Sequence, residues 1–155
     1  MAITNSHTHR FVPVDILTTN YRVVGKVMVS NTGLIGILNN PNTGFAEIHD
    51  ARLARIHMPT KLVDHFEVVR LSKDHLLIAS LNRREDIGPK SLARAGYATT
   101  NQYEVLITMQ NYEAEGAVEW QGRFDFRILM SEGTREFVPL YNANLRGVLI
   151  PTLKI

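Results

Sequence analysis

The chain has 155 residues and a formal net charge of +2, with 17 Lys and Arg against 15 Asp and Glu. Hydrophobic residues make up 45% and charged residues 21% of the sequence, which excludes a disordered or fibrous protein and is enough for one packed domain or two very small ones. The absence of cysteine excludes disulfides, thiolate metal sites and cysteine nucleophiles, and it favours a cytoplasmic location. We expect no secretory signal and no membrane span, because no apolar run approaches roughly 20 residues.

Strand-like patterns dominate residues 14–81, which we predict to be a first β module. Gly25 lies inside an extended, β-branched stretch, where a bulge or sharp bend is expected. Thr32 is expected to cap a short helical turn. After it, FEVVRL and HLLIASL are predicted to pair as a hairpin around a polar loop at residues 72–74.

The two halves of the chain resemble each other. NYRVVGKVMV from Asn20 aligns with NYEAEGAVEW from Asn111, which places Gly25 opposite Gly116. After one inserted residue, FAEIHDARLARI aligns with FVPLYNANLRGV, which begins at Phe137. The repetition predicts two copies of one module, and a glycine at the same place in each copy is typical of the bent strands of a small barrel.

Residues 82–102 form a polar linker marked by Pro and Gly, and residues 103–155 form the second module. This module has no counterpart of the FEVVRLSKDHLLIASL run at residues 66–81, so we expect it to be truncated and to have unpaired strand edges. One candidate to cover them is the N-terminal segment, residues 1–13, as a displaced strand that includes the start of RFVPVDIL at 10–17. The other candidate is a strand from a second subunit, which makes the protein a homo-oligomer.

FAEIHDARL followed by FEVVRLSKDHLLIASL resembles a bacterial family of Sm-like domains of unknown function. In that family an aromatic, small and acidic strand precedes a hairpin with a polar-Asp-His-apolar run, which is KDHLL at residues 73–77 here. The resemblance covers residues 14–81 and part of 103–150, and it implies a strongly bent five-stranded barrel with a tendency to assemble. The predicted fold is therefore all-β, with two copies of a small Sm-like barrel module. A single β-sandwich built from both copies is the alternative.

The C-terminal apolar run supplies a candidate subunit interface. A lone edge strand as hydrophobic as Val148, Leu149 and Ile150 aggregates when exposed, so we expect these residues and Leu153 to lie between subunits. Pro151 lacks an amide donor, which limits pairing along this edge and favours a closed assembly over a fibre.

The strongest basic concentration is in the linker. Arg83, Arg84, Lys90 and Arg94 are candidate contacts for an anion or a nucleic acid. The acidic residues at 85–86 lie among them and weaken the local field, so a solvated linker accounts for the same charges.

Catalytic chemistry has little support in the sequence. The six histidines are interpreted as structural, because within the His49-Asp50 and Asp74-His75 pairs adjacent side chains of a strand point to opposite faces. The chain has neither a nucleophile elbow nor a phosphate-binding or dinucleotide fingerprint, and we expect no cofactor and no metal. The function predicted is a non-enzymatic oligomeric scaffold or assembly protein. The alternative is a nucleic-acid or anionic-ligand binding module of Sm-like type.

Overall fold

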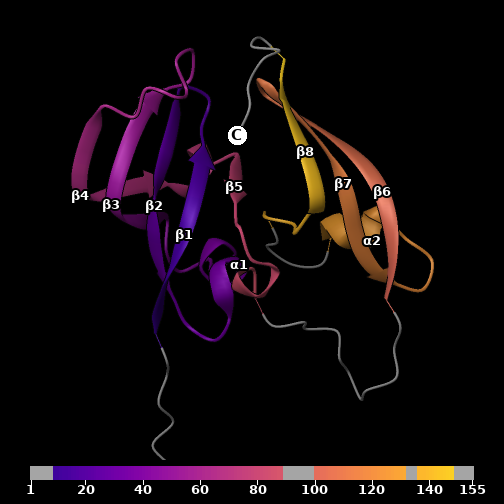
Figure 1. Ribbon diagram of the computed structural model, residues 1–155. Helices are drawn as coiled ribbons and strands as arrows, with labels where there is room; N and C mark the ends of the chain where they lie inside the picture. Colours follow the sequence, from indigo (N-terminus) through magenta and orange to yellow (C-terminus); the bar gives the residue numbers. More distant parts are fainter. Residues whose placement is uncertain (1–8, 89–99, 132–135, 149–155) are drawn as a thin grey trace, which may run out of the picture.

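The computed structural model describes residues 9–88, 100–131 and 136–148. These residues form two antiparallel sheets, of five and three strands, together with short helices (Figure 1). The all-β class predicted from the sequence is confirmed.

The first sheet has the order β4-β3-β2-β1-β5. Its strands are β1 (Arg10–Leu17), β2 (Tyr21–Val29), β3 (Phe45–Arg55), β4 (Asp64–Ser72) and β5 (Ile78–Ser80). Alternate side chains of β1, β2 and β3 are buried, as expected for strands with one face on a core. The short helix α1 (Gly33–Leu38) closes this core with Leu34 and Leu38. Thr32 precedes α1, but its side chain makes no capping hydrogen bond.

The predicted hairpin between the strands at residues 66–81 is wrong. β4 pairs with β3 and β5 pairs with β1, so the two strands lie at opposite edges of the sheet. The connection between them is a turn of 3-10 helix, η1 (Lys73–His75), and its lysine is buried. A polar tripeptide is expected to face water. Here it connects strands at the two edges of the sheet, and the side chain of Lys73 is buried.

Lys73 fastens α1 to the sheet. Its Nζ donates to the carbonyl oxygens of Ile37 (2.6 Å) and Asn40 (3.0 Å) and to Oγ1 of Thr43 (2.7 Å). These acceptors lie at and beyond the C-terminal end of the helix, where carbonyl groups have no partner within the helix. Removal from water lowers the pKa of Lys73, while the charge of Glu136 acts in the opposite direction.

The N-terminal run RFVPVDIL does not close the second module. Residues Arg10–Leu17 are β1, which is paired with β2 along its whole length and with β5 at Asp15–Leu17. The strand therefore belongs to the interior of the first sheet, and the boundary predicted at residue 13 falls within it. Its buried positions, such as Val12 and Val14, explain this place, because they continue the apolar face of β2.

The second sheet has the order β6-β7-β8. Its strands are β6 (Thr100–Met109), β7 (Tyr112–Gln121) and β8 (Tyr141–Gly147), with helix α2 (Phe126–Ser131) between β7 and β8. The same succession of two strands, a short helix and a third strand opens the first sheet. The segment between β7 and β8 is thus helical in part.

Both sheets contain the same irregularity opposite a glycine. In the first sheet Val24 pairs with Arg52 and Lys26 with His49, so β3 has one extra residue opposite Gly25. This is the bulge expected there. In the second sheet Glu115 pairs with Asn144 and Ala117 with Tyr141, which places one extra residue of β8 opposite Gly116.

The backbone at the two bulges has the same conformation. Asp50 in β3 and Asn142 in β8 have positive φ angles, of 49° and 51°. Asp and Asn accept this left-handed region more readily than most residues. The bulged strand comes so close that a Cβ added to Gly25 lies 2.8 Å from the carbonyl oxygen of His49. Glycine is therefore required by space at this position.

A few specific contacts join the two sheets. The hydroxyl of Tyr112, which is buried, donates to the carbonyl oxygen of Thr18 at 2.6 Å. Asn39 exchanges two hydrogen bonds with the backbone of Phe137, at 3.0 and 2.9 Å. Leu17 packs in one cluster with Tyr112. These contacts fix one sheet on the other.

Candidate functional site

A cleft with a volume of about 1710 Å³ lies between the two sheets. β5, β6, β7 and β8 contribute to its walls, together with both α-helices and the segment that leads into β8. In a β-sandwich this space is filled by interdigitated side chains from two facing sheets. The open volume favours two separate modules over the sandwich alternative.

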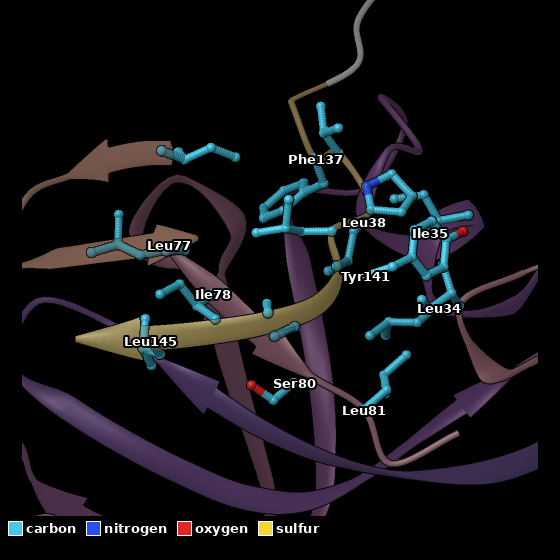
Figure 2. A pocket seen from close by; sticks show the side chains of 18 of the residues that line it. Leu34, Ile35, Leu38, Leu77, Ile78, Ser80, Leu81, Phe137, Tyr141 and Leu145 are labelled. Carbon is cyan, nitrogen blue, oxygen red and sulfur yellow. The ribbon is translucent and has the colours of Figure 1, made fainter. Parts of the chain in front are cut away.

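β5 and β8, which each have an unpaired edge, both line this cleft. β5 pairs with β1 and β8 pairs with β7, and neither has a second neighbour within the described residues. Figure 2 shows side chains of both strands along the cleft. They are, on the β5 side, Leu77, Ile78, Ser80 and Leu81, and on the β8 side Phe137, Tyr141 and Leu145. An unpaired edge offers backbone N–H and C=O groups to another strand.

The lining is mainly apolar near the contact between the sheets. Leu145 of β8 packs in the same cluster as Leu77 and Ile78, so β5 and β8 approach each other there. Further along, Phe137 packs against the first core. These apolar parts of the wall suit apolar side chains, while Arg83 and Arg84 are among the charged residues that also line the cleft.

Tyr112 lies at the closed end of this arrangement. Burial raises the pKa of its hydroxyl to about 12. The hydroxyl keeps its proton at neutral pH and remains a donor to Thr18. It therefore helps to hold the two sheets together.

The structure separates the predicted basic contacts. Arg83 forms an exposed ion pair with Glu85, and this carboxylate raises the pKa of Arg83. Arg84 forms an ion pair with Glu119 of β7, and its guanidinium lies 4.1 Å from the ring centre of Tyr141. Arg84 thus connects the short 3-10 helix η2 (Arg84–Asp86) to the second sheet. Lys90 and Arg94 lie outside the described residues.

Val148 is the part of the predicted subunit interface that the structure describes. It is 56% exposed, and its backbone N–H donates to the carbonyl oxygen of Asn111 at 2.9 Å. The matching bond in the first sheet runs from Ile56 to Asn20, at 2.8 Å. Leu149, Ile150 and Leu153 lie outside the described residues.

The outer edge strand of the first sheet is a second candidate surface. No residue of β4 is fully buried and its first five are all exposed, and the strand has no neighbour beyond β3 among the described residues. Phe66 and Val68, two residues apart on one face, are 47% and 39% exposed. Val69 and Leu71, on the opposite face, pack against the core.

A histidine of β4 pairs with a carboxylate across strands, and one of β3 lies near a carboxylate of its own strand. Nε2 of His65 lies 2.5 Å from Oδ1 of Asp50, and this hydrogen bond lowers the pKa of Asp50. His49 lies 3.8 Å from Glu47, and its ring meets the edge of Phe11. Nowhere in residues 9–88, 100–131 and 136–148 do three His, Asp or Glu side chains gather as metal ligands would.

Sequence reasoning missed the residues that join the parts. Lys73 was assigned to a polar loop and Tyr112 was not singled out as a candidate site residue, although each bridges elements far apart in the chain. A lysine between two apolar strands is the signal that was available for the first. Tyr112 aligns with Tyr21, so the sequence indicates the same role for the two tyrosines, whereas in the structure Tyr112 is buried and Tyr21 is 41% exposed.

Comparisons of the chain with protein-family models, with curated proteins and with solved structures found no match. Among the helices that the structure describes, none has the length and apolar character needed to cross a membrane.

Proposed function

We propose that the protein is a non-enzymatic scaffold that forms a homo-oligomer through β4, the outer strand of its first sheet. The observation that carries this proposal is the exposure of β4, which combines an unpaired edge with solvent-exposed Phe66 and Val68. Strands of this kind are normally shortened, covered or paired with another chain. β4 has nine residues, so it offers a long edge for pairing.

Pairing of β4 with β4 of a second copy is the simplest closed arrangement. A two-fold axis normal to the sheet places the two edge strands antiparallel and joins two five-stranded sheets into one. Such an isologous contact satisfies both edges at once and leaves none of them for a fibre. Phe66 and Val68 then lie on the same face near the axis, where side chains from both copies cover them.

We also infer that the two sheets derive from one duplicated unit. The shared order of elements, the bulge opposite Gly25 and Gly116, and the positive φ angles of Asp50 and Asn142 support this inference. Relationship of this unit to Sm-like domains stays a prediction from the sequence.

Light scattering of the purified full chain tests the oligomer. We expect a mass twice that of one chain of 17.5 kDa, and a Phe66→Lys, Val68→Lys double variant that falls to 17.5 kDa while its circular dichroism is unchanged. Both replaced side chains are already partly in water, so the fold tolerates the change.

Leu106→Lys is the matched control, because Leu106 is 63% exposed on β6, the outer strand of the other sheet. We expect this variant to keep the wild-type mass. A wild-type mass of 17.5 kDa contradicts the proposal. So does a double variant that keeps the oligomer, or a control that loses it, because either result places the interface elsewhere.

A further inference from the structure

The unpaired edge of β8 corresponds to an edge of β3 in the first sheet, and there the structure shows the strand that pairs with it, β4. The bulges align Asp50 with Asn142, so β8 corresponds to the second part of β3. β3 has β2 on one side and β4 on the other, whereas β8 has β7 on one side and no strand on the other among the described residues. The first sheet therefore shows which kind of strand this edge accepts.

The cleft provides a second edge opposite the first. β5 has a single partner, β1, and its other side lies in the cleft that β8 also lines. An occupant of this cleft meets unpaired strand edges from both sheets. An edge strand of a folded second copy, such as β4, already has one edge bound to β3 and has only one left to offer. An isolated extended segment has both edges available.

The side chains along the cleft define the pattern that the occupant needs. In the first sheet Val69 and Leu71 of β4 lie opposite Ile48 and Ala46 and pack in the core. The alignment of FAEIHDARL with FVPLYNANL places Leu140 and Val138 at the positions of those two β3 residues. Both line the cleft. Apolar side chains at alternate positions therefore fit there.

We propose that the cleft between β5 and β8 binds one extended peptide segment of a partner protein, which adds to the β8 edge as β4 adds to β3. This inference rests on the proposed scaffold function and names the class of partner. The segment has apolar side chains at alternate positions and no sheet of its own. β8 has seven residues, and paired strands have nearly the same rise per residue, so the bound segment has a similar number of residues.

A synthetic peptide with the sequence of β4, DHFEVVRLS, is the probe, and register-specific disulfide formation is the readout. The wild-type chain has no cysteine, so single thiols are unambiguous. Arg52 pairs with His65 in the first sheet, and Asn144 of β8 corresponds to Arg52. Each peptide is supplied as a mixed disulfide with an aromatic thiol, and the protein thiolate displaces that aromatic thiolate, so no further oxidant is needed. We expect the reduced, full-length Asn144→Cys variant to form a mixed disulfide with the His65→Cys peptide at least about tenfold faster than with a Ser72→Cys peptide.

The matched control is the Arg52→Cys variant of the full chain. The side chains of Arg52 and Asn144 are both exposed, but the edge of β3 at Arg52 is already paired with β4. Leu145→Cys with an Asp64→Cys peptide tests the adjacent pair, whose geometry in an antiparallel ladder differs from the first. We expect both matched pairs on β8 to react faster than the Ser72→Cys peptide does, although at rates that differ between the two pairs, and the Arg52→Cys variant to react slowly with the His65→Cys peptide.

Equal rates for matched and mismatched peptides at both β8 positions overturn the inference, as do equal rates for the Asn144→Cys and Arg52→Cys variants. The result is separable from the test of the scaffold. A monomer that reacts in register contradicts the oligomer and supports the strand-binding cleft. An oligomer that reacts without register contradicts the strand-binding cleft alone.

Discussion

The two sheets use the same bulged strand, but they differ in what covers it. β3 is bonded on both sides, and β8 is bonded only to β7 among the described residues. Each bulge has a glycine opposite it and a residue with positive φ within it. The bulge is thus a property of a short local sequence. The strand that pairs with the other edge of β3 is β4, which lies outside this local sequence.

The helices that follow the second strand of each sheet show the same difference. In α1, the N–H of Ile35 donates to Ile87 at 2.9 Å, and the carbonyl of Ile37 accepts from buried Lys73. In α2, Phe126 and Ile128 are 61% and 43% exposed. Both of these hydrogen-bond partners of α1 come from the chain after β4. The burial of α1 therefore depends on this later part of the first module as well as on the sequence of the helix.

The largest effect is expected at the glycines opposite the bulges. A Cβ at Gly25 lies 2.5 Å from Cγ2 of Ile48 and 2.8 Å from a backbone oxygen, so Gly25→Ala should lower the free energy of unfolding by about 3 kcal/mol. For Gly116→Ala the nearest atom, Cγ of Leu140, is 2.9 Å away at the cleft, and we expect about 2 kcal/mol. Urea denaturation measures both. Gly44→Ala, with open space around it, is the control, and effects no larger than the control would show that the bulges tolerate a side chain.

Lys73→Met tests whether this lysine stabilises α1 and leaves α2 unaffected. The variant leaves three acceptors without the Nζ donor, and we expect a loss of about 2 kcal/mol in unfolding free energy. Thermal unfolding measures the loss, and Lys26→Met, at an exposed lysine of β2, should change little. Hydrogen exchange should become faster in α1 and stay the same in α2. Equal acceleration in both helices contradicts the assigned role of Lys73.

Tyr112→Phe tests the contact between the sheets. Loss of the hydroxyl bond to Thr18 should lower the unfolding free energy by about 1 kcal/mol at neutral pH. The pKa of Tyr112 is raised to about 12 from an ordinary value near 10, so the folded chain holds this proton more tightly than the unfolded chain. Its stabilising contribution is complete below pH 10 and is lost as the pH rises through 12.

Denaturation curves of wild type and Tyr112→Phe between pH 9 and 12 measure this dependence. The two proteins should converge in stability as the pH rises. A constant difference over the whole range would show that the hydroxyl does not couple folding to its ionisation.

The smallest effect is expected from the linker arginines. Arg84→Met removes an ion pair with Glu119 and a cation–π contact with Tyr141, and about 0.5 to 1 kcal/mol should be lost. Arg83→Met removes only an exposed pair within η2 and should be nearly neutral. Chemical denaturation of the two variants compares them. A larger loss for Arg83→Met would reverse the assignment of which arginine joins the second sheet.

The all-β class and the bulge at Gly25 were predictable because both follow from local patterns. β-branched stretches favour strands, and a glycine inside one indicates a bulge. Strand partners were not predictable in the same way. The short polar run at residues 72–74 is typical of a hairpin, but burial of Lys73 against α1 directs the chain across the sheet to β1. That choice depends on tertiary contacts.

Candidate site residues were harder to predict for a related reason. Arg83 and Arg84 are adjacent and chemically equal in the sequence, and only the fold assigns one to solvent and the other to Tyr141. The cleft depends on how two modules meet, through contacts such as Asn39 with Phe137. Side chains that contact each other across nearly 100 residues of sequence leave no local pattern.

Hydrogen exchange along β3 and β8 tests most directly the claim that the two strands are equivalent in construction and different in cover. In the full-length protein, the amides of His49, Arg52 and Leu53 of β3 should all exchange slowly, because these residues are paired with both β2 and β4. In Tyr141–Gly147 of β8, amides bonded to β7 should exchange slowly and the alternate amides, on the unpaired edge, should exchange rapidly. Uniform protection along β8, equal to that of β3, would contradict the account.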